Sequence, residues 1–127
     1  MSYLLDTHAV IWYFENSLEL PGKIEELIDD PTISIYICSI SLWEIAIKIN
    51  LGKLNLKLPL DELLDSIKNR EFNILQIENE YLQGLVDLPF IHKDPFDRLI
   101  IATAVAEDLT IITIDENIQK YDVNCIW

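Results

Sequence analysis

Short runs of apolar residues recur along the chain, and each is followed by a segment with helical spacing. Residues 33–40 (ISIYICSI) are β-branched and aromatic, whereas residues 41–49 (SLWEIAIKI) switch to a 3.6-residue period. Strands that carry near-continuous Ile and Leu, without alternating polar residues, are typical of parallel sheets covered on both faces. The predicted fold class is therefore α/β, a three-layer α/β/α domain with a central, mainly parallel sheet.

Apolar runs occur along the whole chain. They predict strands at residues 2–6, 33–40, 72–77, 109–115 and 123–127. Segments with helical spacing predict helices at residues 8–14, 22–30, 41–49, 60–69, 79–88 and 95–109. A chain of 127 residues without a linker or internal repeat falls in the size range of one domain. Residues 1–127 are thus predicted to form a single domain.

Neither a membrane segment nor a cysteine framework is indicated. No apolar run approaches the roughly 20 residues of a spanning helix, and MSYLLDTH lacks both a basic head and a small-residue cleavage site. We therefore expect a soluble, cytoplasmic protein that does not bind membranes. Cys38 and Cys125 lie far apart, without a CxxC pair, so we expect small buried side chains and neither a zinc site nor a disulfide.

The charge balance restricts the possible partners. With 22 Asp and Glu against 9 Lys and Arg, the formal net charge is −13, which argues against nucleic acid because phosphates normally meet a basic face. The one notable basic cluster is KINLGKLNLK, with Lys48, Lys53 and Lys57. A solvated face is its default interpretation. A local cationic track for RNA is the alternative hypothesis.

Acidic residues are placed where predicted strands give way to helices. Asp6 ends the first strand, Glu44 follows the second, Asp94 and Asp97 open the long helix, and Asp115 follows the strand at 109–115. In open α/β sheets, ligands bind at the carboxyl ends of the strands. These five carboxylates are therefore expected to converge on one edge of the sheet.

Helix capping is the competing interpretation of the same acids. Ser41 and Glu44 have the spacing of a capping box, Asp94 precedes Pro95, and Asp115 precedes a short predicted helix. Taken singly, each acid is as consistent with a cap as with a catalyst. Asp6 favours a site, because it ends a strand that should be central and Thr7 could cap equally well.

Crowded carboxylates repel one another and raise each other's pKa, so a cation is expected among them. Mg²⁺ prefers one or two carboxylates, water molecules and a phosphate oxygen. A metal ion placed there can lower the pKa of a bound water and stabilise a leaving oxygen. The pattern therefore predicts metal-assisted hydrolysis of phosphodiester bonds.

Four segments, LLDTHAVIWY, SISLWEIAIKINLGKL, HKDPFDRLIIATA and TIITIDENI, occur in this order. Together they closely resemble the PIN-domain family and, within it, the VapC-type toxins of prokaryotic toxin–antitoxin pairs. The resemblance spans nearly the whole chain, including the terminal VNCIW. It implies a PIN-like fold and a Mg²⁺- or Mn²⁺-dependent endoribonuclease that cleaves RNA.

The resemblance also implies roles for individual residues. Its acidic quartet is Asp6, Glu44, Asp97 and Asp115. We expect Asp6 and Asp97 to ligate the metal most directly, while Glu44 and Asp115 ligate through water or orient the nucleophile. The accessory positions that the resemblance implies are Thr7, Thr113 and Asp94.

Other residues near the acids leave alternatives open. His8 and His92 have no partner at ligand spacing, which favours a supporting or structural role over direct ligation. Arg98 could pair with an acid of the site or contact phosphate. The consecutive aromatics at 12–14 cannot all face one core from one helix. The resemblance suggests that leftover apolar surface serves a homodimer and an antitoxin helix.

A receiver domain and a non-catalytic PIN-like module are the two alternative functions. A phospho-accepting receiver domain is also a small acidic α/β protein, but it should show an acidic pair after the first strand and a lysine after the last. Neither is apparent in LLDTH or VNCIW. A non-catalytic module that keeps the PIN-like fold would be expected to lose part of the acidic quartet. The complete quartet favours the nuclease.

Overall fold

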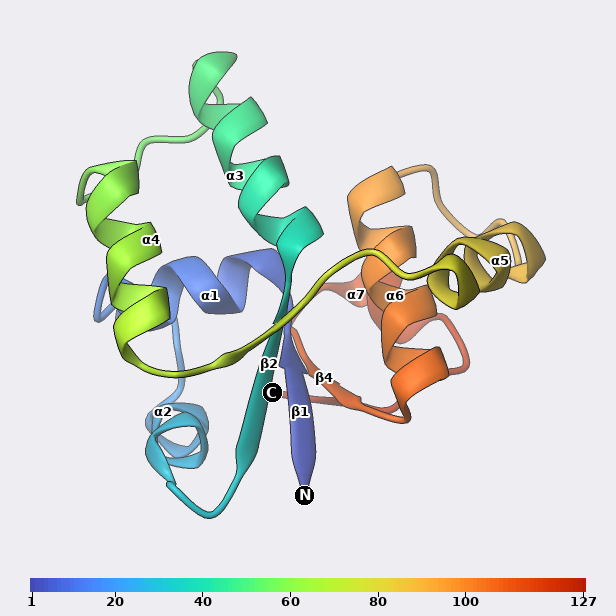
Figure 1. Cartoon of the computed structure of the whole chain (residues 1–127), viewed down its shortest axis with the longest axis horizontal. Coiled ribbons are helices and arrows are strands. Elements are labelled where there is room, and N and C mark those ends of the chain that lie inside the picture. Colours follow the sequence, from blue (N-terminus) through green and yellow to red (C-terminus); the bar gives the residue numbers. More distant parts are fainter.

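The computed structural model describes all of residues 1–127 (Figure 1). It contains five strands and seven helices in largely alternating order. The strands are β1 (Ser2–Leu5), β2 (Ser34–Cys38), β3 (Asn73–Leu75), β4 (Thr110–Ile112) and β5 (Cys125–Ile126). The helices are α1 (Thr7–Phe14), α2 (Gly22–Asp29), α3 (Ser39–Asn50), α4 (Leu60–Asn69), α5 (Asn79–Asp87), α6 (Pro95–Glu107) and α7 (Glu116–Gln119).

The five strands form one sheet in the order β3-β2-β1-β4-β5, and every neighbouring pair is parallel. In the central strand β1, Leu5 pairs with Ile37 of β2 on one side and with Ile112 of β4 on the other. All strands therefore end at the same edge, which is where the sequence places its acids.

Helices cover both faces of the sheet. Successive side chains of a strand point to opposite faces, so each strand contributes to two hydrophobic cores. Leu5 and Ile37 belong to the core under α1, α2, α3 and α4. Leu4 and Ile111 belong to the second core, under α5, α6 and α7. Figure 1 shows the two groups of helices on either side of the strands. The predicted three-layer α/β/α architecture is confirmed.

All six predicted helices are present, but the predicted boundary between β2 and α3 was wrong. Helix α3 begins at Ser39, two residues before the predicted start, and β2 ends at Cys38. Ser41 therefore lies inside the first turn and does not cap the helix, so Ser41 and Glu44 do not form a capping box. The last three strands are also shorter than predicted, with three, three and two residues.

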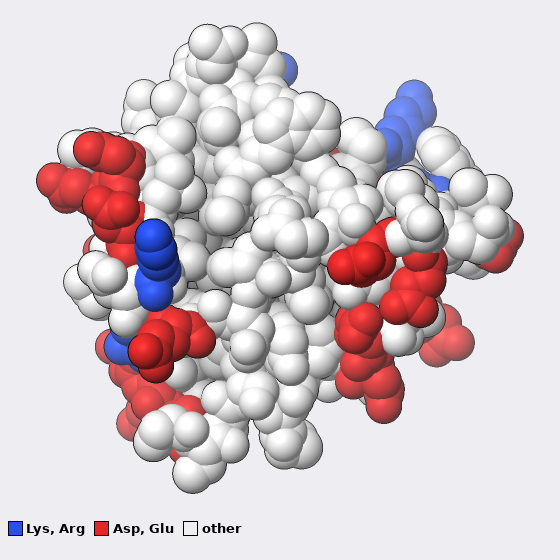
Figure 2. All heavy atoms as spheres, in the orientation of Figure 1, with Lys and Arg blue, Asp and Glu red and all other residues white.

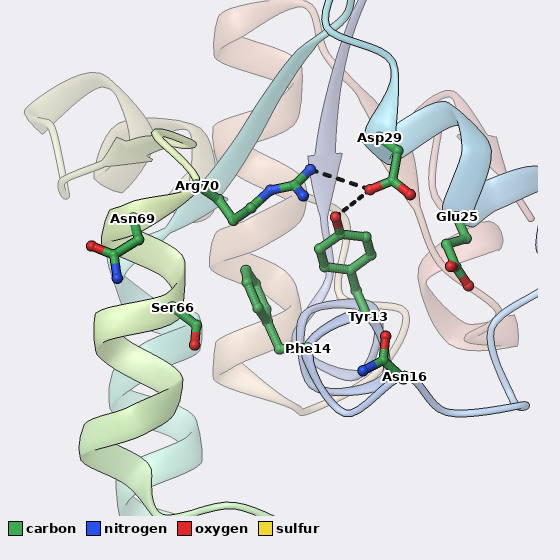
Figure 3. Close-up of a pocket in the computed structure, with 8 residues that line it drawn as sticks. All are labelled: Tyr13, Phe14, Asn16, Glu25, Asp29, Ser66, Asn69 and Arg70. Carbon is green, nitrogen blue, oxygen red and sulfur yellow. Dashed lines mark hydrogen bonds and ion pairs between the residues drawn. The ribbon is translucent and has the colours of Figure 1, made fainter.

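A polar cluster holds three helices of the first layer together (Figure 3). The Tyr13 hydroxyl, on α1, donates to Asp29 of α2. Arg70, which follows α4, places its Nη2 3.2 Å from the same carboxylate and lies over the rings of Tyr13 and Phe72. Tyr13, Asp29 and Arg70 line a hollow of about 460 Å³. The consecutive aromatics are thus divided: Tyr13 packs here, while Trp12 packs edge-on against Trp127.

The cysteines are both free, with Cys38 buried and Cys125 partly buried. Burial raises the pKa of the Cys38 thiol to about 12, so this side chain is a protonated, unreactive part of the core. None of the helices has the length and apolar character needed to cross a bilayer.

Helix α6 contributes seven buried residues, and its core side chains should make a large contribution to stability. Ile101 is fully buried in the second core, whereas Val105 on the same helix is 56% exposed. We expect Ile101→Ala to cost about 2–5 kcal/mol of unfolding free energy, because it leaves a cavity. The matched Val105→Ala should change it by less than about 0.5 kcal/mol. Urea denaturation would measure both, and equal losses would contradict the assigned core.

Candidate active site

Asp6 lies at the end of the central strand and is 3% exposed. One oxygen, Oδ1, accepts a hydrogen bond from the Ala9 amide at 2.8 Å, and Oδ2 accepts one from the Thr113 hydroxyl. Asp6 is therefore the N-cap of α1, and the expectation that Thr7 would serve as well was wrong. Burial raises the pKa of Asp6, against the hydrogen bonds from Thr113 and Ala9, which lower it.

Glu44 reaches the same edge from α3 and is 2% exposed. Its Oε1 accepts a hydrogen bond from the Thr7 hydroxyl at 2.6 Å, and the Ser41 hydroxyl lies 3.0 Å from that of Thr7. Its Oε2 forms an ion pair with Lys48 at 2.5 Å, one turn further along α3. Thr7, the first residue of α1, thus links α1 to α3, and Lys48 neutralises the buried carboxylate of Glu44.

Asp94 and Asp97 divide the work at the start of α6. Asp94 is the N-cap, since its Oδ1 accepts from the amides of Phe96 at 2.9 Å and of Asp97 at 3.1 Å. Asp97 Oδ2 lies 3.1 Å from His92 Nε2, and its Oδ1 has no hydrogen-bond partner. The predicted capping role of Asp94 is confirmed, whereas Asp97 accepts no hydrogen bond from a backbone amide of α6.

Asp115 follows β4 and caps the short helix α7. Its Oδ1 accepts from the amides of Asn117 at 2.7 Å and Ile118 at 3.4 Å, which leaves Oδ2 uncommitted. Its own amide donates to the Thr113 hydroxyl at 3.0 Å. Thr113 therefore contacts both Asp6 and Asp115, and it holds the two acids in fixed relation.

The acids act on one another electrostatically. Burial, followed by the negative charge of Asp94, is the main reason that the pKa of Asp97 is raised to about 7. Asp115 and Glu44 add to this effect, while the His92 hydrogen bond opposes it. Asp94, Asp115 and Glu44 are therefore close enough to Asp97 to act on its charge. No group of three or more Asp, Glu, His or Cys side chains is close enough to enclose a metal ion.

The structure excludes one of the two alternatives for Arg98, the pairing with an acid of the site. Arg98 pairs with no acid: its guanidinium donates to the Pro89 carbonyl at 2.9 Å and to the Tyr121 hydroxyl at 3.0 Å, and it is 7% exposed. The basic cluster is also divided, because Lys48 is paired with Glu44. Lys53 and Lys57 are exposed on the segment that follows α3. Figure 2 shows few cationic side chains on one face of the molecule, with acids toward its edges.

The sequence predicted the role of His92 near the site but not that of Tyr121. His92 contacts Asp97 directly, in agreement with the supporting role that its spacing suggested. Tyr121, which bonds both His92 and Arg98, was not recognised in the sequence. The large hollow of Figure 3 lies elsewhere and contains none of the quartet.

The raised pKa of Asp97 has a measurable consequence for stability in the metal-free protein. Between the ordinary value of 3.8 and about 7, the folded state holds a proton that the unfolded state releases. The stabilisation is complete at low pH and is lost as the pH rises through about 7. With chelator at about pH 8, Asp97→Asn should therefore raise Tm by roughly 4 °C or more. The difference should shrink toward pH 5, and a lower Tm for the variant at pH 8 would contradict the shift.

Comparisons with known proteins agree with this architecture. Solved structures match the whole chain in fold. A chain of VapBC2 from Rickettsia felis, crystallised with a DNA fragment from its promoter, is 21% identical with a TM-score of 0.75, covering 100% of this chain and 99% of that one. A chain of FitAcB from Neisseria gonorrhoeae is 21% identical with a TM-score of 0.65, covering 100% and 97%.

A third match is a chain of VapBC-5 from Mycobacterium tuberculosis, a member of the VapBC family of toxin–antitoxin systems, at 18% identity and a TM-score of 0.66, covering 98% of this chain and 97% of that one. A search of curated protein sequences finds no significant match. The family model described as PIN domain matches residues 3–124, nearly the entire chain. The chain therefore belongs to the PIN-domain family.

Proposed function

We propose that this protein is a metal-dependent endoribonuclease, the VapC-type toxin of a toxin–antitoxin pair. The observation that carries the proposal is the set of four acids from separate segments at the carboxyl edge of a PIN-domain sheet. These acids are Asp6, Glu44, Asp97 and Asp115. Repulsion among clustered acids destabilises the fold, and such clusters are typical of catalytic sites. Their position at this edge therefore favours phosphodiester hydrolysis over binding alone.

The donor set fits a hard divalent cation such as Mg²⁺ or Mn²⁺, which prefer carboxylate oxygens. Asp97 Oδ1 and Asp115 Oδ2 have no other hydrogen-bond partner. The side chains are too far apart to form a closed cage, but Mg²⁺ normally keeps several waters and takes a phosphate oxygen. When bound, the cation would activate a water molecule and stabilise the leaving oxygen.

The protein's own residues would then share the remaining work. Asp97 and Asp6 would hold the cation, while Glu44 and Asp115 would act through water or orient the nucleophile. The N-terminus of α6 favours negative charge on Asp97, because the helix dipole is positive there. Thr7 and Thr113 keep the carboxylates oriented through the hydrogen bonds to Glu44 and Asp6.

RNA is the proposed substrate despite the net charge of −13. Lys53 and Lys57 are exposed on the segment after α3, the helix that carries Glu44, so they could contact the RNA backbone away from the reacting phosphate. Lys48 already balances Glu44 and would contribute to phosphate binding only through that pair. The absence of a broad basic face implies modest, local electrostatic binding.

A cognate antitoxin is the proposed protein partner, and a homodimer is the proposed assembly. The antitoxin is supported by the likeness to VapBC-5, a member of the VapBC family of toxin–antitoxin systems. This chain exposes apolar side chains on α5 and on the loop behind it: Leu82, Val86, Phe90 and Ile91. Exposed apolar side chains that occur close together in the chain, as here, are a feature expected of a protein interface. Action on cellular RNA, restrained by an antitoxin, is consistent with a cytoplasmic location.

The two alternatives fare differently. The order β3-β2-β1-β4-β5 differs from the 2-1-3-4-5 order of receiver domains, so the receiver hypothesis is wrong. A non-catalytic PIN module has the same fold and is distinguished only by activity.

The proposal is tested by RNA cleavage with purified protein in Mg²⁺, in Mn²⁺ and with chelator. We expect activity with either metal and none with chelator. Asp97→Asn should reduce the rate at least about 100-fold, because it removes a charged oxygen at the reacting phosphate.

Asp65→Asn is the matched control, since it makes the same change on an exposed face of α4. It should leave the rate unchanged. Cleavage that survived both chelation and Asp97→Asn would sink the mechanism, and no cleavage by any preparation would favour the non-catalytic module.

A further inference from the structure

A buried network of side chains stands behind Asp97, and its centre is the hydroxyl of Tyr121. This side chain is 5% exposed and belongs to the segment after α7. Its oxygen lies 3.0 Å from Arg98 Nη1, 2.8 Å from His92 Nδ1, and 3.3 and 3.1 Å from the amides of Ile91 and His92. The His92 ring reaches Asp97 through its other nitrogen.

The protons in this network can be assigned by counting donors. Arg98 and the two backbone amides can only donate, so the Tyr121 oxygen accepts from them. The single proton of the hydroxyl is left for an acceptor, and His92 Nδ1 is the partner within reach. His92 Nδ1 is therefore unprotonated. In the neutral ring the proton then lies on Nε2, where it donates to Asp97 Oδ2.

Arg98 and Tyr121 also shape the segment that carries His92. Residues 88–94 form no helix or strand. The Arg98 guanidinium donates to the Pro89 carbonyl and lies within 3.5 Å of the Leu88 carbonyl. The Tyr121 hydroxyl accepts from the amides of Ile91 and His92. Side chains thus take the place of secondary structure in satisfying this backbone. The exposed ring of Phe90 covers the guanidinium, 4.6 Å from its centroid.

We propose that Tyr121, held by Arg98, is a positioning residue for the acidic site: it selects the Nε2–H form of His92, which fixes Asp97 Oδ2 and leaves Oδ1 without a hydrogen-bond partner. The inference deepens the proposed nuclease function and rests on it for its catalytic effect. Partners that orient a ligand of a metal typically change metal affinity or activity about 10-fold to 100-fold.

The tautomer can be measured without metal or RNA. The chain has only two histidines, so imidazole nitrogen chemical shifts of His8→Gln report His92 alone. At about pH 8, where an ordinary imidazole is neutral, we expect the Nε2–H form in this background. Adding Tyr121→Phe should give a mixture of both forms. A wild-type Nδ1–H form, or shifts unaffected by Tyr121→Phe, would overturn the inference even if the protein cleaves RNA.

The catalytic effect is tested by a double-mutant cycle. Tyr121→Phe should lower kcat and Mn²⁺ affinity about 10-fold to 100-fold, with KM for RNA within roughly 3-fold. His92→Gln keeps an amide donor that does not depend on tautomer, so it should retain most activity, whereas His92→Ala should not. In the His92→Gln background, Tyr121→Phe should then cost less than about 3-fold.

Tyr81→Phe is the matched control, because Tyr81 is another buried tyrosine and bonds Glu107 at 2.9 Å, at the far end of α6. It should affect stability but not kcat or Mn²⁺ affinity. An equal loss from Tyr121→Phe in both His92 backgrounds would mean that Tyr121 acts only through the fold. If the wild-type protein cleaved no RNA, the proposed function would fail, while the tautomer and Mn²⁺ binding would still decide the positioning role.

Discussion

Repulsion among buried carboxylates is the constraint on which this structure depends. Asp97 is the clearest case, since its pKa is raised to about 7 by burial and by neighbouring acids. The fold tolerates the acids because each has a donor close by: an amide and a hydroxyl for Asp6, Lys48 and a hydroxyl for Glu44, and His92 for Asp97. What the donors leave unbalanced is negative charge, which a divalent cation can neutralise.

Capping and chemistry are not alternatives at this edge. A carboxylate has two oxygens, and in Asp115 one binds the amides that begin a helix while the other is uncommitted. Asp6 caps α1 in the same manner and is held by Thr113 as well. In a parallel sheet one acid can serve both roles, because a helix begins just beyond the strand end, where the ligand site also lies. A cap therefore fixes the rotamer of an acid at no separate cost.

The sequence was sufficient for the layers of the fold and for the positions of the acids. Continuous Ile and Leu in the strands, and acids at their ends, are local patterns that burial explains directly. The start of α3 was missed because Ser39 and Ile40 continue a β-like run, and packing overrode that weak local preference. Arg98 and Tyr121 were misjudged or missed because their partners lie 9 to 30 residues away in the chain. Spacing rules contain no information on such contacts.

The ties that build the site also decide when it can exist. The Thr113 hydroxyl meets Asp6 across a sequence separation of 107 residues, and Thr7 meets Glu44 across 37. Both contacts require β1 to be in place between β2 and β4. Because β1 is the central strand, the N-terminal segment must join the C-terminal one before the acids are brought together. Loop closure over such distances is costly in entropy, so partly folded chains do not assemble the acids. The same topology that concentrates negative charge thus confines it to the completed fold.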